Sequence, residues 1–282
     1  MARPSISDKR NAFRKLHESG CFVIPNPWDL GSTRYLQHLG FKALASTSAG
    51  FAFAMGMPDG AVSRDMVLAH IAEIVAASDL PVNADFEGGF AHDPQGVAEN
   101  VRLCVETGVA GLSIEDATGD AAKPLYDLDE AIARMRAARD AIDKTGSGVL
   151  LTGRCETFLV ARPDLGFAIE RLKAYSDAGA DVLYAPGIRT REQIEAVVKA
   201  VAPKPVNLLM PAALGFSVDD IAAMGVHRVS VGSTLARVAW TAFINAAKEI
   251  AGQGTFDSFK GTASHAELNA FFRDDWMKRS ET

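Results

Sequence analysis

Cysteine is scarce in this sequence, and its few copies are scattered. Cys21, Cys104 and Cys155 form an odd set with no C-x-x-C pair among them. A disulfide-stapled fold uses an even set of cysteines, and a zinc knuckle uses closely spaced pairs. The sequence therefore predicts neither kind of site, and it favours a reducing compartment such as the cytoplasm.

Long apolar runs and an excess of positive charge are also absent. No stretch approaches the roughly 18 consecutive apolar residues of a membrane span, and the start, MARPSISDKR, lacks the apolar centre of a signal peptide. The formal net charge is −6, whereas nucleic-acid-binding proteins usually carry a basic face. We therefore expect a cytoplasmic protein that binds neither a membrane nor a nucleic acid.

Two patterns of common α/β enzymes are missing. The first β-rich run ends in NPWDLGS, which lacks the G-x-G-x-x-G spacing of a dinucleotide-binding turn. A Schiff-base aldolase needs a lysine where a barrel strand ends, but Lys42 and Lys204 stand where β-rich runs begin. A doubly wound nucleotide-binding sheet and a lysine-dependent aldolase are therefore both disfavoured.

The sequence does contain a regular alternation of short β-rich runs and longer amphipathic patterns, such as 129–143 and 167–179. Strand and helix alternating eight times predict a closed α/β fold, the (β/α)8 TIM barrel. We expect a single barrel domain over 1–282, with an N-terminal helix in 1–19 and a C-terminal helical appendage in 252–282. The eight predicted strands are 21–26, 42–48, 80–87, 109–116, 148–156, 181–186, 204–209 and 227–233.

Acidic side chains gather where the third and fourth predicted strands end. The stretch PVNADFEGGF places Asn83, Asp85 and Glu87 at alternate positions, so all three share one face of a strand. Glu115 ends the next strand, and the carboxyl ends of barrel strands surround one opening. Oxygen ligands from few residues suit Mg²⁺ or Mn²⁺ better than Zn²⁺, which predicts a metal site formed by these four residues. The alternative is a structural ion pair between Arg154 and one of the acids.

Three further candidates lie near the same opening. Arg154 faces inward if Leu150 and Thr152 share its face, and its guanidinium would then bind a substrate carboxylate or a developing enolate oxygen, or neutralise a glutamate. The same alternation turns Cys155 toward the helices, which predicts a buried, inert thiol rather than a nucleophile. His92 follows EGGFA on a loop, either as a general acid or as a solvated histidine.

Seven motifs follow one another along the predicted barrel: NPWDLGSTRYLQHLGFKALASTSAG, MGMPDG, PVNADFEGGF, GLSIEDATG, GRCETF, PVNLLM and RVSVGS. In this order and spacing they resemble the isocitrate lyase/phosphoenolpyruvate mutase superfamily. The resemblance implies a (β/α)8 barrel that exchanges its eighth helix with a paired subunit, usually in a homotetramer built as a dimer of helix-swapped dimers. Such an exchange would explain the extra helical pattern at 263–272.

The resemblance also implies residues that bind a small 2-oxo carboxylate substrate. Ser46, Thr47 and Ser48 would offer backbone N–H groups and a hydroxyl to its carboxylate. Trp28, which follows the first strand, and Asn207, at the rim of the seventh, are further candidates for substrate binding.

The implied catalytic residues overlap with the implied metal site. Asp59, Asp85 and Glu115 match acidic positions around Mg²⁺ (or Mn²⁺), and Arg154 matches an arginine that approaches the oxygens of the substrate. Together with His92, three of these complete the candidate catalytic set: Arg154, Glu115 and Asp59.

The sequence departs from the superfamily's patterns at places that bear on the reaction. Asn83 stands where many members have the first aspartate of Asp-Ala-Asp, so the metal site carries one negative charge fewer, for which Glu87 would compensate. The region GGFAHDPQG lacks the Lys-Lys-Cys-Gly-His loop of isocitrate and methylisocitrate lyases. Ala117 stands where phosphoenolpyruvate mutases have a lysine.

These observations lead to one expected function and two alternatives. We expect a Mg²⁺-dependent C–C bond lyase or decarboxylase that acts on a small 2-oxo or 2-hydroxy di- or tricarboxylic acid through a metal-stabilised enolate. One alternative is a P–C bond enzyme of the phosphoenolpyruvate mutase or phosphonopyruvate hydrolase type. The other is a barrel that binds an oxo acid without turning it over.

Overall fold

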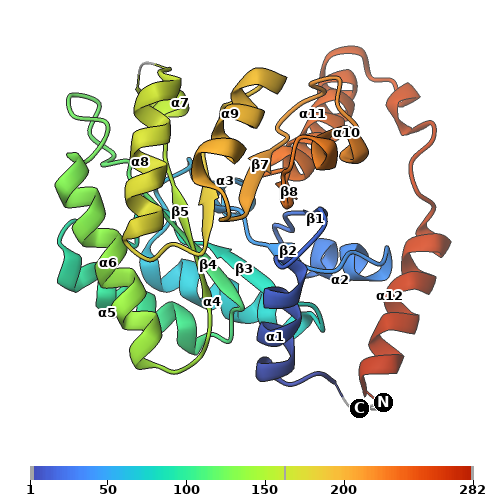
Figure 1. Cartoon of the computed structure of the whole chain (residues 1–282). Coiled ribbons are helices and arrows are strands. Elements are labelled where there is room, and N and C mark those ends of the chain that lie inside the picture. The colour runs from blue at the N-terminus through green and yellow to red at the C-terminus, as the bar shows by residue number, and fades with distance from the viewer. Residues whose placement is uncertain (1–2, 162, 281–282) are drawn as a thin grey trace.

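The predicted (β/α)8 barrel is confirmed by the computed structural model, which describes residues 3–161 and 163–280 (Figure 1). Eight parallel strands form one sheet in the order β1-β8-β7-β6-β5-β4-β3-β2. Each strand is shorter than its predicted run because only part of the run joins the sheet. The strands are β1 Phe22–Ile24, β2 Leu44–Ala45, β3 Val82–Asp85, β4 Gly111–Glu115, β5 Leu150–Arg154, β6 Val182–Tyr184, β7 Val206–Leu209 and β8 Arg228–Ser230.

Helices surround this sheet, and the two predicted helical patterns at 129–143 and 167–179 are confirmed as α6 and α8. Two short helices, α3 after β2 and α7 after β5, were not predicted. The helices are α1 Ile6–Leu16, α2 Leu30–His38, α3 Ser48–Ala54, α4 Arg64–Ala77, α5 Pro94–Glu106, α6 Leu128–Lys144, α7 Thr157–Val160, α8 Leu165–Asp177, α9 Arg191–Val201, α10 Val218–Ala223, α11 Thr234–Gln253 and α12 His265–Ser280, with a 3₁₀ turn at Asp257–Phe259.

A side chain closes the barrel where its first and last strands meet. Asn26, which follows β1, accepts hydrogen bonds from the backbone N–H groups of Val231 and Gly232 beyond β8 and donates one to the carbonyl of Ser46 beyond β2. The Asn26 side chain is buried, so these bonds form away from competing water. Asn26 therefore holds three strand ends together at the carboxyl rim of the barrel.

Helix α1 closes the opposite end of the barrel (Figure 1). Phe13 is fully buried there in a cluster with Ile24, Ala43, Ala45, Ala110 and Leu150. The approach is so close that a Cβ atom on Gly111 would lie 2.6 Å from the Phe13 ring, which explains why β4 begins with glycine. The barrel floor is therefore built by the N-terminal helix as well as by the strands.

The C-terminal helices are arranged differently from the rest. Of the 20 residues of α11, only Ala236 is buried, and the side chains of Val238 and Phe243 are more than half exposed. Helix α12 stands outside the ring of barrel helices and lies along α2, where Phe271 packs edge-on against Tyr35 (Figure 1). The apolar residues of α11 are therefore left without a cover in the single chain.

Within residues 3–161 and 163–280, no helix is both long enough and apolar enough to cross a membrane.

Candidate active site

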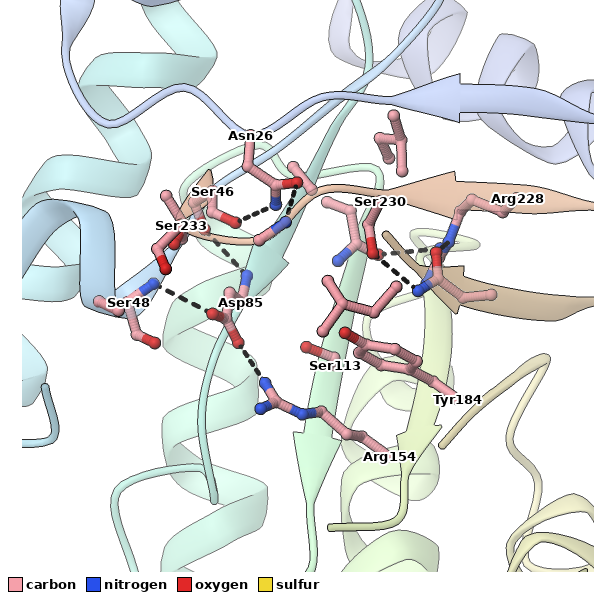
Figure 2. A pocket seen from close by; sticks show the side chains of 18 of the residues that line it. Asn26, Ser46, Ser48, Asp85, Ser113, Arg154, Tyr184, Arg228, Ser230 and Ser233 are labelled. Atoms are coloured by element: carbon pink, nitrogen blue, oxygen red, sulfur yellow. Dashed lines mark hydrogen bonds and ion pairs between the residues drawn. The ribbon is translucent and has the colours of Figure 1, made fainter. Parts of the chain in front are cut away.

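A cavity of about 180 Å³ lies inside the barrel, reached from the carboxyl ends of the strands. Most of the residues nominated from the sequence line it, and they come from β2, β3, β5 and β7 and the segments that follow them (Figure 2). The nominated residues on this lining are Ser46, Thr47, Ser48, Asp59, Asn83, Asp85, Arg154 and Asn207.

Arg154 is the centre of charge at the cavity mouth. Its Nη1 lies 3.1 Å from Asp85 Oδ1 and 3.1 Å from Glu115 Oε2, and its Nε donates to Glu156. These contacts follow from the sheet, because Glu115 and Arg154 are register partners at the ends of neighbouring strands. The predicted convergence of Asp85, Glu115 and Arg154 therefore occurs in the structure, as a network of ion pairs.

Asp85 also connects the mouth to the segment before α3. Its Oδ2 accepts a hydrogen bond of 3.0 Å from the backbone N–H of Ser48, and its own N–H donates to the Ser46 hydroxyl (Figure 2). Thr47 is the N-cap of α3, where its hydroxyl accepts from Gly50 N. The groups expected to meet a substrate carboxylate are thus partly engaged within the protein.

The mouth contains more carboxyl groups than cations. Burial lowers the pKa of Arg154, but Glu115, Glu156 and Asp85 outweigh that effect and raise it well above its usual value. Burial raises the pKa of Glu115 to about 8, and neighbouring carboxylates add to the shift although Arg154 opposes it. One guanidinium therefore does not neutralise the acids around it.

Glu87 and Asp59 extend this acidic region outward. Burial, followed by the nearby charges of Asp85 and Asp59, raises the pKa of Glu87 to about 7. Burial, followed by Asp85, also raises the pKa of Asp59. Glu87 has a left-handed backbone, with φ of 48°, which costs free energy in a residue other than glycine. Its side chain lines a second, outer cavity of about 590 Å³ that shares Ser48, Asp59 and Arg154 with the inner one.

His92 lies on this outer cavity rather than in the inner one. Its Nδ1 is 2.6 Å from the Tyr126 hydroxyl, and the carbonyls of His92, Ala91 and Gly88 accept hydrogen bonds from the guanidinium of Arg134. Arg134 also stacks over the Tyr126 ring. The loop that carries Glu87 and His92 is therefore held in place by α6.

Asp116 positions Glu156 through contacts on the helix-facing side of the sheet. It follows Glu115 at the end of β4, and alternation turns it toward the helices, where it is buried. Its Oδ1 accepts from Glu156 N at 2.8 Å, and its Oδ2 accepts from Arg171 Nε at 2.7 Å and from the Tyr175 hydroxyl. This ion pair fixes the backbone of Glu156 and so the position of a partner of Arg154.

Two other nominated side chains lie away from the acidic mouth. Trp28 lines a separate groove with Trp240 and Phe243 of α11, and it is not on the lining of the inner cavity. Asn83 lies one layer below Asp85, and its Oδ1 is 3.5 Å from Arg228 Nη1. Trp28 therefore lies beside α11, off the lining of the inner cavity, and its role in substrate binding stays a prediction.

Cys155 is buried, as the alternation predicts. Its Sγ lies 3.1 Å from the Thr157 hydroxyl. Burial, followed by the charge of Asp116, raises the pKa of the thiol to about 12, so it stays protonated and unreactive at neutral pH.

Sequence reasoning missed several residues on the inner cavity. Arg228 is the most important, because it is a cation at the beginning of β8, whereas only strand ends were searched. Ser113 and Ser230 also line the cavity. Alternation within β4 and β8 provides a signal for the two serines, since Ser113 shares a face with Glu115 and Ser230 with Arg228.

Comparison with known proteins places the chain in a family. The family model for phosphoenolpyruvate phosphomutase matches residues 13–251, which include every barrel strand. The chain belongs to the phosphoenolpyruvate phosphomutase family.

Several known proteins resemble this chain in sequence or in fold, and two of them are named as a lyase or a decarboxylase. A crystal structure from Burkholderia cenocepacia J2315 is 49% identical, covers 95% of this chain and 97% of its own, and superposes with a TM-score of 0.92. A 2,3-dimethylmalate lyase of the PEP mutase/isocitrate lyase superfamily is 26% identical, covers 99% of both chains and has a TM-score of 0.84. The oxaloacetate decarboxylase of Rhodopseudomonas palustris (strain ATCC BAA-98 / CGA009) is 34% identical over 235 residues, which are 78% of this chain and 77% of its own.

The predicted superfamily is therefore confirmed, and the named relatives are lyases, in agreement with the predicted class of enzyme.

The donor atoms at the mouth of this family member fit a divalent cation. They are carboxylate oxygens, the ligands that Mg²⁺ and Mn²⁺ prefer, and burial, together with neighbouring carboxylates, raises the pKa values of Glu87 and Glu115. Asp85 and Glu115 would hold the ion, with Asp59 and Glu87 facing it. Among the described residues, no three acidic, histidine or cysteine side chains already converge as a preformed ligand set, so water or substrate would have to complete the coordination.

The crowded acids predict how stability depends on pH without a divalent ion. Glu87 and Glu115 keep their protons to higher pH in the folded than in the unfolded chain. Unfolding then releases protons, so in EDTA the free energy of unfolding should fall as the pH rises from about 7 to about 8. Below this range the buried His17 and His70, whose pKa values are lowered, oppose the trend. Urea denaturation across this range measures the effect.

Glu87→Gln should make this decline shallower, whereas Glu99→Gln on the exposed face of α5 should leave it unchanged. A free energy of unfolding that rises with pH across the same range would contradict the assignment.

Proposed function

We propose that this protein is a divalent-metal-dependent lyase that breaks a C–C bond of a small 2-oxo or 2-hydroxy di- or tricarboxylic acid through an enolate. The observation that carries the proposal is the convergence of Asp85, Glu115 and Arg154 at the mouth of a small polar cavity. The lyase and decarboxylase relatives act on acids of this kind by their names, which supports the same class of substrate here.

The residues of the mouth divide the work of such a reaction. When bound, a divalent ion supplies Lewis-acid polarisation of the 2-oxo group. Breaking the bond at C3 moves an electron pair toward the C2 oxygen, and the Arg154 guanidinium stands where it would stabilise that developing negative charge. Ser48 N–H and the Ser46 hydroxyl fix Asp85, and Asp116 fixes Glu156, so the acids and Arg154 are held before the substrate arrives.

The raised pKa values of Glu87 and Glu115 support the binding of a cation at the mouth. Without a cation, the carboxyl groups of Glu87 and Glu115 retain protons near neutral pH. A bound divalent cation would favour their ionised forms, so metal binding should release protons and tighten as the pH rises. The ion is therefore proposed as Mg²⁺, or Mn²⁺, on the chemistry of these oxygen donors.

Turnover of a panel of acids tests the proposal. Oxaloacetate, substituted malates and methylisocitrate should be assayed with Mg²⁺, and EDTA should abolish the turnover of any substrate found until Mg²⁺ is restored. Asp85→Asn, which keeps the shape but removes the charge, should lower kcat by about 100-fold or more. Asp140→Asn, on the exposed face of α6, is the matched control and should be neutral.

Turnover that survives both EDTA and Asp85→Asn would exclude the metal-dependent mechanism. The name of the family, phosphoenolpyruvate phosphomutase, supports P–C bond chemistry as a second candidate function. Phosphonopyruvate should therefore be included, and ³¹P NMR of its products would identify a P–C bond enzyme.

We also propose a homotetramer built from helix-swapped dimers. The exposed apolar side chains of α11, among them Val238 at 62% and Phe243 at 61%, support it because a second subunit would remove them from water. Trp28, Trp240 and Phe243 line a groove at the same place, which continues this apolar surface.

Light scattering after gel filtration should give a mass near four times 30.0 kDa. Phe243→Asp should shift the protein to smaller species, because it would bury a charge in the proposed interface. Lys144→Asp on α6, which Figure 1 shows on the other side of the barrel, is the control. A wild-type protein that elutes as a monomer at micromolar concentration would refute the assembly.

A further inference from the structure

The floor of the inner cavity contains a cation that no step of the proposed reaction uses. Arg228 is the first residue of β8, whereas Arg154 is the last residue of β5, so the two guanidinium groups belong to opposite ends of the strands. Arg228 lines the cavity and is only 3% exposed. Figure 2 shows it in a group with Ser230, separate from the group formed by Asp85, Ser48 and Arg154.

The partners of Arg228 are neutral. Its Nε donates to Asn207 Oδ1 at 2.8 Å, and its Nη2 donates to Thr152 Oγ1 at 3.1 Å. Its Nη1 has only long contacts, at 3.4 Å to His17 Nε2 and at 3.5 Å to Asn83 Oδ1. Within the part of the chain that the structure describes, no carboxylate forms an ion pair with this guanidinium.

His17 does not neutralise the charge of Arg228. Its Nδ1 lies 2.8 Å from the carbonyl of Phe13, which assigns the ring proton to Nδ1 and leaves Nε2 as an acceptor. Burial, followed by Arg228, lowers the pKa of His17 to about 3, so the ring is neutral at physiological pH. Burial lowers the pKa of Arg228 to about 10, which still leaves the guanidinium charged.

A buried charge without a counter-ion is costly, and the cost is larger when its donors are incompletely hydrogen-bonded. An anion bound at the floor of the cavity would serve as the counter-ion of Arg228 and accept hydrogen bonds from its guanidinium. Asn207 and Ser230 extend the polar surface, because Asn207 Nδ2 donates to the Ser230 hydroxyl and Ser230 hydrogen-bonds the Tyr184 phenol. The cavity, of about 180 Å³, has room for a small organic acid.

We propose that Arg228, framed by Asn207 and Ser230, binds the second carboxylate of the substrate and makes the enzyme select dicarboxylic over monocarboxylic acids. The acidic mouth with its divalent ion would hold one end of the substrate, and the cationic floor would hold the other. The inference rests on the proposed function for the nature of the substrate, but the charge of the floor does not depend on the metal.

Asn207 offers a substitution that tests the floor while preserving the fold. Asn207→Asp has the same shape and keeps an oxygen beside Arg228 Nε. It supplies the missing counter-ion from within the protein, so it should stabilise the fold and repel a second carboxylate. Arg228→Gln removes the cation directly, but it also leaves Asn207 and Thr152 without their donor.

Calorimetric titration with malate and lactate tests the proposal, because these 2-hydroxy acids differ in the second carboxylate. Titrations should be run in EDTA and again in Mg²⁺, on the wild type, Asn207→Asp and Arg228→Gln. We expect the wild type to bind malate at least about tenfold more tightly than lactate under both conditions, the fold-change typical of a charge-assisted hydrogen bond. Both variants should lose this preference while their thermal unfolding remains cooperative.

A wild type that does not distinguish the two acids would overturn the inference, as would a preference that survives in Asn207→Asp. These outcomes differ from failure of the proposed function. A preference for malate in EDTA without turnover of any acid would support the carboxylate site at Arg228 and contradict the lyase proposal. Turnover without the preference would support the lyase proposal and contradict the carboxylate site.

Discussion

The structure of the cavity mouth depends on the balance between one guanidinium and the carboxylates around it. Arg154 joins the ends of β3, β4 and β5 through its contacts with Asp85, Glu115 and Glu156. If Arg154 were lost, three buried or half-buried acids would face one another without a cation, a change that typically costs about 3–5 kcal/mol for even a single broken buried pair. One guanidinium does not neutralise the three carboxylates, and a divalent ion would supply the missing positive charge.

The cavity is therefore polarised along the barrel axis. Acidic groups outnumber cations at the carboxyl ends of the strands, while Arg228 stands without an acid at the floor. A metal ion at one end and a guanidinium at the other would orient an elongated dianion in a single direction. Helix α1 makes this possible, because Phe13 and His17 seal the floor and keep Arg228 away from bulk water.

Periodicity in the sequence predicts the fold and the mouth, because alternation along a strand decides which side chains point inward. Asp85, Glu115 and Arg154 were found in this way, and the register of β4 with β5 brings the last two together. The prediction failed where a local pattern cannot report a distant contact. Arg228 was missed because it stands at the start of its strand, where no site residue was sought.

A crystal structure with Mn²⁺ and oxalate, analysed at the manganese absorption edge, tests the central claim most directly. Oxalate stands for the oxo-acid end of the substrate. The charge balance predicts an anomalous peak within coordination distance of Asp85, with Arg154 turned from Asp85 and Glu115 toward the oxalate oxygens. No peak at the mouth, with Arg154 still paired to both carboxylates, would show that the acidic cluster is purely structural.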